Sequence, residues 1–134
     1  MALVNWNQNE WIDRPWHQKH SVKFGLRWES GLWNIGGFAS YHSGWPTTDR
    51  VRNAGDVATS LYRNDLPSYF SLDLHIGRRV PTQHGELTFY ADLLNSTNER
   101  NEGGHSYRAE DDEILRKPRR LFPIVPVIGI RWRW

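Results

Sequence analysis

Val127-Ile128-Gly129-Ile130-Arg131-Trp132-Arg133-Trp134 is the stretch of sequence that decides the fold. Apolar residues at 128, 130, 132 and 134 alternate with Arg131 and Arg133, and this period of two predicts a β-strand with one apolar and one charged face. Soluble domains rarely finish on their most hydrophobic residue, because chain ends usually extend into water. In a barrel closed within lipid both edges of every strand are paired, so an apolar ending favours such a barrel.

The same alternation recurs upstream and predicts an all-β protein. It indicates strands at about 20–29, 32–43, 69–80 and 86–95 and a final strand at about 119–134. Polar residues dominate about 44–67 and 96–118, which we interpret as long loops. We therefore expect an antiparallel, up-and-down meander of about five strands, in a single domain covering residues 1–134.

Period-two patterning also predicts the two faces of the sheet. One face should be polar and the other should face lipid, because Lys or Arg at mid-bilayer costs roughly 2–4 kcal/mol on the lipid side of such a barrel. The polar set is Lys23, Arg27, Ser71, Asp73, His75, Glu86, Thr88, Asp92, Arg131 and Arg133, and the apolar set is Val22, Phe24, Leu26, Leu72, Leu74, Ile76, Leu87, Phe89, Ile130 and Trp132.

The short turn at 81–85 predicts the register of the strands that flank it. If Val80 pairs with Leu87, His75 lies opposite Asp92 in a charge-assisted contact. Tyr90 then lies opposite Gly77, where its ring would fill the space above the glycine.

Composition restricts the function without excluding a membrane. Only 38% of the 134 residues are hydrophobic and the mean hydropathy is -0.72, but only alternate strand residues face lipid in a transmembrane β-barrel. No apolar run approaches the roughly 20 residues of a transmembrane helix, and the polar turn at Asn5 leaves no signal-peptide core. The chain has no cysteine, and a net charge of +2 gives no support for nucleic-acid binding.

The spacing of the connections agrees with an outer-membrane barrel, in which short turns face the periplasm and long loops face outward. Predicted connections run short, long, short, long. Interface aromatics also fall near strand ends, with Trp28, Trp33 and Trp134 on the short-turn side and Tyr41, Trp45 and Tyr69 on the other.

Several segments resemble the late barrel strands of TonB-dependent outer-membrane receptors. They are Arg14-Pro15-Trp16-His17-Gln18-Lys19-His20-Ser21-Val22, Tyr41-His42-Ser43-Gly44-Trp45-Pro46-Thr47-Thr48, and Leu66-Pro67-Ser68-Tyr69-Phe70-Ser71-Leu72-Asp73-Leu74 with Arg78-Arg79. Ala91-Asp92-Leu93-Leu94-Asn95 resembles the N-L-F-N segment of the family's penultimate strand, with Asp92 and Leu94 replacing Asn and Phe. Gly129, Trp132 and Trp134 are similar to the C-terminal assembly signal of outer-membrane proteins, although Val127 stands where a polar residue is usual.

The resemblance implies energy-coupled uptake of a scarce nutrient, such as a ferric siderophore, across a bacterial outer membrane. The family's barrel has about 22 strands and a plug, so about five strands would be its C-terminal portion and not transport-competent alone. We expect a truncated gene, a fragment or a partial gene product. The implied partners are outer-membrane lipid, the remaining strands and plug, the barrel-assembly machinery, and TonB only through the missing N-terminal region.

Ligand contacts in the parent receptor should come from the long loops, because loops on a rigid scaffold concentrate binding groups. Arg and Tyr suit anionic, aromatic-rich chelates. The candidates are Trp45, Arg50, Arg52, Tyr62, Arg63, His105, Tyr107 and Arg108. Solvated loops with no binding role are the alternative for the same residues.

No cofactor, metal site or enzyme is predicted. His17 and His20 lie three apart, so in a strand they point to opposite sides, and Glu110-Asp111-Asp112-Glu113 lacks the spacing of a calcium loop. No nucleophile with its base and orienting group is recognisable. The competing hypothesis is a soluble all-β ligand- or carbohydrate-binding module that uses exposed tryptophans, such as Trp6, Trp11, Trp16 and Trp45.

Overall fold

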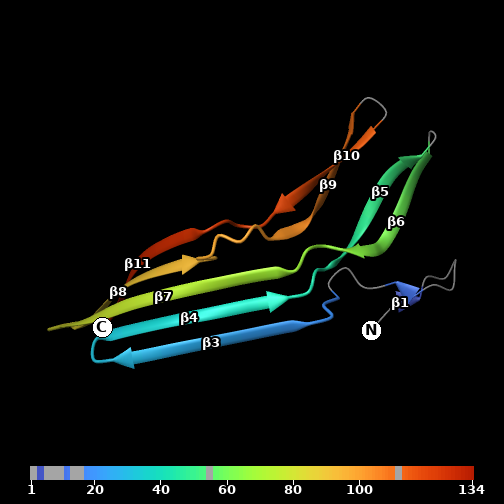
Figure 1. Ribbon diagram of the computed structural model, residues 1–134. Coiled ribbons are helices and arrows are strands. Elements are labelled where there is room, and N and C mark those ends of the chain that lie inside the picture. The colour runs from blue at the N-terminus through green and yellow to red at the C-terminus, as the bar shows by residue number, and fades with distance from the viewer. Residues whose placement is uncertain (1–2, 5–10, 13–16, 54–55, 111–112) are drawn as a thin grey trace. The chain divides into compact units, whose positions relative to one another are not determined.

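A computed structural model of the protein describes the backbone of residues 3–4, 11–12, 17–53, 56–110 and 113–134, and the side chains of 17–48, 64–108, 110 and 114–134. Within these residues the chain is all-β, with eleven strands and no helix (Figure 1). The described residues accordingly include no helix that is long and apolar enough to cross a membrane.

Five strands form the central sheet, in the spatial order β11-β8-β7-β4-β3. Their bounds are β3 Ser21–Ser30, β4 Trp33–His42, β7 Tyr69–Thr82, β8 Gly85–Leu94 and β11 Val125–Arg133. These five strands follow one another across the sheet in chain order. The predicted antiparallel sheet of five strands is therefore confirmed.

The other strands form three two-stranded sheets. They are β1 Leu3–Val4 with β2 Trp11–Ile12, β5 Pro46–Asn53 with β6 Asp56–Asp65, and β9 Glu102–Glu110 with β10 Glu113–Arg120. By its internal contacts the chain divides into two compact units. One unit comprises Met1–Ser21, His42–Tyr69 and Asn101–Leu121, and the other comprises Val22–Tyr41, Phe70–Arg100 and Phe122–Trp134, which includes most of the central sheet.

The two segments expected to be long loops are largely β-hairpins, so the loop prediction for 44–67 and 96–118 is wrong. β5 pairs with β6 and β9 pairs with β10 over most of those ranges. Both hairpins are polar, and a backbone ladder forms without an apolar face to mark it in the sequence. Alternating hydrophobicity identifies a strand only when one of its faces is apolar. It therefore does not identify these two polar hairpins.

The single final strand predicted at 119–134 is also wrong, because two strands share that range. β10 ends at Arg120, and β11 begins at Val125. Pro123 lies between them, and its backbone has no N–H to give to a ladder. The amide of Leu121 instead bonds to the carbonyl of Asn101 at 2.9 Å, which closes the base of the β9–β10 hairpin.

The register of β7 against β8 agrees with the prediction. Val80 pairs with Leu87, His75 with Asp92 and Gly77 with Tyr90. Because alternate residues point to opposite faces, His75 and Asp92 lie on one face and Phe89 on the other. β11 continues the pattern, since Ile130 pairs with Phe89 and Arg131 pairs with Thr88. The predicted division into a polar and an apolar face is confirmed for these three strands.

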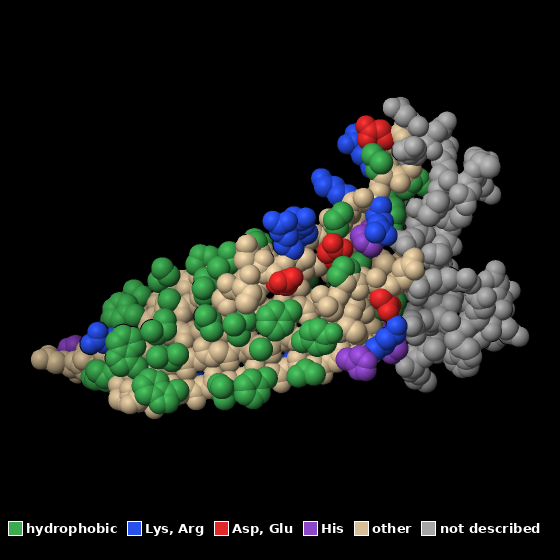
Figure 2. Space-filling model, in the orientation of Figure 1, with side chains coloured by type: hydrophobic (Ala, Val, Ile, Leu, Met, Phe, Trp, Pro, Cys, Tyr) green, Lys and Arg blue, Asp and Glu red, His purple; other side chains and the backbone are tan. Residues whose placement is uncertain are grey.

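The apolar face is exposed in the described part of the molecule. Ile128 is 85% exposed, Leu26 68%, Ile130 65% and Phe24 60%. Figure 2 shows hydrophobic side chains gathered over the strands of the central sheet. Among the described residues only Leu66, outside this sheet, is counted as a buried hydrophobic core residue. The sheet therefore carries a large apolar surface that the described residues do not cover.

Candidate functional site: the polar face and the hairpins

His75 is the centre of a polar network on the sheet face opposite the exposed hydrophobics. Its Nδ1 lies 2.5 Å from Asp92 Oδ1 and its Nε2 lies 2.6 Å from Asn34 Oδ1. Both neighbours present an oxygen acceptor, so an N–H on either ring nitrogen has a hydrogen-bond partner. The three side chains join β4, β7 and β8.

Around this network the polar face forms an open hollow of about 540 Å³. Its charged lining includes Arg27, Asp73, Asp92 and Arg131, and Tyr90 lies among them. The guanidinium of Arg131 lies 5.9 Å from the centre of the Tyr90 ring. Cations and anions are thus mixed over one open polar surface.

The expected placement of the Tyr90 ring over Gly77 is wrong, although the pairing of the two residues is right. A Cβ at Gly77 would lie 2.7 Å from Asn34 Nδ2, so the Asn34 side chain fills that space. A Cβ at Gly129 would lie 2.3 Å from the Tyr90 hydroxyl, so the ring lies over the glycine of the other neighbouring strand. Asn34 explains why the Tyr90 ring lies over Gly129 and not over Gly77, because the Asn34 side chain already fills the space over Gly77.

Gly129 therefore has a packing role beside its predicted place in an assembly signal. We expect Gly129→Ala to destabilise the sheet by about 2 kcal/mol, because the new methyl forces the Tyr90 ring out of its position. The same substitution in a Tyr90→Ala background should have little effect. A double-mutant cycle on urea unfolding in mild detergent measures this coupling, and equal losses in both backgrounds would refute it.

The other two residues of the predicted assembly signal are exposed at the end of β11. The rings of Trp132 and Trp134 meet edge to face, with centroids 6.4 Å apart. On the apolar face, Arg78 lies over the Trp33 ring at 5.2 Å. Trp33 begins β4 directly after the short turn, and Trp132 is the second-last residue of β11. Trp33, Trp132 and Trp134 thus lie at the end of the sheet where the sequence predicts aromatics beside the short turns.

Four of the predicted ligand-contact residues have side chains outside the described residues. Arg50 lies in β5, as does Arg52, whereas Tyr62 and Arg63 lie in β6. These positions are on paired strands, which differs from the free loop expected for them. The prediction that they contact a ligand stays a prediction.

The other four candidates divide into packed and exposed side chains. The Trp45 ring is half-buried and stacks on His42 at 4.8 Å. The side chain of His105 is buried, and Tyr107 donates its hydroxyl proton to the carbonyl of Thr48 at 2.7 Å. Arg108 is exposed on β9. Of these four described side chains, only Arg108 presents its functional group to solvent.

An aromatic stack follows β4 and was missed by sequence reasoning. His42 lies between the rings of Trp45 and Tyr69, at 4.8 and 4.7 Å, and its ring is almost parallel to that of Tyr69. The Nδ1 of His42 lies 2.7 Å from the carbonyl oxygen of Ser43, which accepts an N–H at that nitrogen. The sequence had assigned Trp45 and Tyr69 to an interface girdle. Here both are half-buried against a buried histidine.

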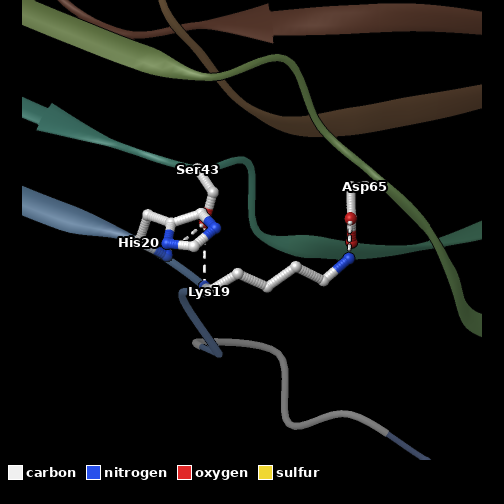
Figure 3. Close-up of polar contacts among 4 residues, drawn as sticks. All are labelled: Lys19, His20, Ser43 and Asp65. Carbon is white, nitrogen blue, oxygen red and sulfur yellow. Dashed lines mark hydrogen bonds and ion pairs between the residues drawn. The ribbon is translucent and has the colours of Figure 1, made fainter.

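Ser43 holds the segment that precedes β3, as Figure 3 shows. Its hydroxyl oxygen accepts the amide protons of Lys19 at 2.8 Å and His20 at 3.2 Å, and its own amide bonds to the His20 carbonyl at 2.9 Å. Lys19 Nζ also pairs with Asp65 Oδ2 at 2.7 Å. The Lys19–Asp65 pair is largely exposed, so it contributes at most about 1 kcal/mol. The contacts are structural, and in the described residues no group of three His, Asp or Glu side chains is arranged to hold a metal ion.

Comparisons of the chain with protein-family models, with curated proteins and with solved structures found no match.

Proposed function

We propose that the chain forms part of the wall of a transmembrane β-barrel, in a TonB-dependent receptor of a bacterial outer membrane. The observation that carries this proposal is the pair of unlike faces of the central sheet. One face exposes Phe24, Leu26, Ile128 and Ile130, and the other bears the His75–Asp92 network.

The wall of a barrel in lipid suits both faces, because hydrocarbon covers the apolar face and the aqueous interior contacts the polar face. Each square ångström of apolar surface left in water costs roughly 25 cal/mol, so an apolar sheet face needs either a packed layer or hydrocarbon. The apolar face also has a hollow of about 470 Å³ among Ile35, Ile76 and Ile128, with the small Ala91 in its lining. A hollow of this kind suits a disordered, fluid filling such as acyl chains.

The ends of the sheet fit the same proposal. Arg78 is a cation on the apolar face, and it lies over Trp33 at the first residue of β4. Tryptophan and arginine are favoured at the membrane interface, where the ring or stem meets hydrocarbon and the polar group meets headgroups. Trp132 lies in the last strand and Trp134 directly follows it. These side chains would mark the periplasmic boundary.

The receptor assignment rests on the resemblance of the late strands and on the two hairpins. β5–β6 and β9–β10 would carry the ligand-contact residues. The sheet order ends at β3 and at β11, and open edges within lipid leave backbone groups unsatisfied. The remaining strands of the receptor would pair with those edges, and the rest of the receptor would supply the coupling to TonB for uptake of a nutrient such as a ferric siderophore.

Single cysteines test the proposal, since the natural chain contains none. Phe24→Cys and Ile130→Cys place a thiol on the apolar face, and Lys23→Cys and Arg131→Cys are their controls on the polar face. In zwitterionic lipid vesicles we expect a water-soluble maleimide to label the two apolar-face thiols far more slowly than the two controls. In urea without lipid all four thiols should react alike.

The soluble binding module predicts a different result. Its thiols should show no lipid-dependent difference between neighbouring positions, and the chain should remain a folded monomer without detergent. That outcome would overturn the membrane proposal. It would instead support the hypothesis that the exposed tryptophans bind a ligand.

A further inference from the structure

The β9–β10 hairpin has two chemically different faces, and its register defines them. Leu115 pairs with Arg108, Lys117 with Ser106 and Arg119 with Gly104. Opposed residues share a face and so do alternate residues along a strand. Arg108, Leu115, Lys117 and Arg119 therefore lie together, and we call this set the cationic face.

The other face of the hairpin is packed. It carries His105, whose side chain is buried, and Tyr107, whose hydroxyl bonds to the Thr48 carbonyl in β5. Because His105 and Tyr107 alternate with Ser106 and Arg108 along β9, the cationic face points away from that packing. Arg108, Leu115, Lys117 and Arg119 are all exposed. In Figure 2, Lys and Arg side chains gather near the strands that Figure 1 labels β9 and β10.

The positive charges on this face have no ion-pair partner among the described residues. The described acid nearest the base of the hairpin, Glu102, lies 3.7 Å from His105 on the packed side. Glu110 lies toward the hairpin tip, at the end of β9. By the same alternation Glu110 belongs to this face at its tip end, where it pairs with Glu113, whereas the exposed cations Lys117 and Arg119 lie toward the base. The base end of the cationic face is therefore positive.

We propose that the cationic face binds the phosphate-bearing headgroups of an anionic lipid surface. Arg and Lys bind phosphate by charge-assisted hydrogen bonds, and cations beside a membrane gain from its negative surface potential. Leu115 is 47% exposed among them. An apolar side chain between cations favours a lipid surface over a nucleic acid, because the headgroup layer meets hydrocarbon. The inference rests on the proposed function and names the lipid chemistry that this hairpin contacts.

Vesicle binding of the full chain tests the inference. The probes are phosphatidylcholine vesicles and vesicles that also contain phosphatidylglycerol, each at low and high salt. We expect tighter binding to the anionic vesicles at low salt and loss of that difference at high salt. The variant Arg108→Gln/Lys117→Gln/Arg119→Gln should lose roughly fivefold in anionic-vesicle affinity per cation, or about a hundredfold in all.

The matched control is Lys23→Gln/Arg100→Gln/Arg133→Gln, which removes the same charge from exposed cations outside the hairpin. It should keep the preference for anionic vesicles. Circular dichroism and tryptophan fluorescence should show that both triple variants retain the β-structure of the parent chain.

Each other outcome has a distinct meaning. Equal binding to both vesicle types, or equal losses in both triple variants, would overturn the inference and leave the membrane proposal intact. Binding to neither vesicle would overturn both proposals. A single-stranded oligonucleotide that binds as tightly as anionic vesicles, with the same loss in the hairpin variant, would overturn the assignment of a lipid partner.

Discussion

Replacing Asn95 with alanine is expected to lower the free energy of unfolding by about 4 kcal/mol. Asn95 is only 6% exposed. Its Nδ2 donates to the carbonyls of Glu99 at 2.9 Å and Phe122 at 3.2 Å, and its Oδ1 accepts the Glu99 amide proton at 3.1 Å. Its backbone amide also bonds to Asp73 Oδ1 at 2.8 Å. One side chain thus joins the end of β8 to the segment that leads into β11.

The backbone of Asn95 adds a second cost for alanine. Its φ is 49°, in the left-handed region that asparagine tolerates better than alanine does. Asn95→Gly should therefore be less harmful than Asn95→Ala by about 1 kcal/mol, because it loses the same three bonds without the strain.

Asn98→Ala is the matched control for this prediction. Asn98 also has a positive φ, of 53°, but it is exposed and its side chain accepts one bond, from the Ile124 amide at 3.1 Å. We expect a loss of about 1–2 kcal/mol there. Urea unfolding in mild detergent measures both variants, and equal losses at 95 and 98 would show that the buried bonds of Asn95 are not the cause.

The central sheet could be predicted from the sequence because one face is strongly apolar. A shift of one residue would move every apolar side chain to the other face, so the pattern fixes the register. That reasoning placed His75 opposite Asp92 and Tyr90 opposite Gly77, as observed. It did not give the direction of the Tyr90 ring, because two neighbouring strands each offer a glycine and only Asn34, distant in the chain, fills one of those spaces.

The hairpins and the junctions between strands could not be predicted in this way. β5, β6, β9 and β10 are polar, so no hydrophobic alternation indicates their backbone pairing. The boundary between β10 and β11 depends on the hydrogen bond from the Leu121 amide to the Asn101 carbonyl. Proline at 123 was the available signal for that boundary. Among the candidate site residues, Trp45 and Tyr107 were selected by residue type, but their contacts with His42 and Thr48 depend on packing.

Replacing Gly44 with alanine is expected to destabilise the fold by about 3 kcal/mol or more, through steric overlap alone. A Cβ at this position would lie 1.6 Å from the carbonyl oxygen of Leu66 and 2.6 Å from its carbonyl carbon. These are backbone atoms, so no side-chain rotation relieves the overlap. The Leu66 amide bonds to the Trp45 carbonyl at 2.9 Å, and Leu66 itself is buried. The substitution therefore separates the segments after β4 and β6.

Gly36→Ala provides the control, because Gly36 also lies close to the backbone of another strand. A Cβ there would lie 3.4 Å from the Leu26 carbonyl oxygen and 3.8 Å from His75 Cβ, which are ordinary contact distances. Neither glycine has a positive φ, so the two substitutions differ mainly in available space. Gly36→Ala should change the free energy of unfolding by less than about 1 kcal/mol. If Gly44→Ala unfolded at the same urea concentration as Gly36→Ala, the close approach of Gly44 to Leu66 would not be a feature of the folded protein.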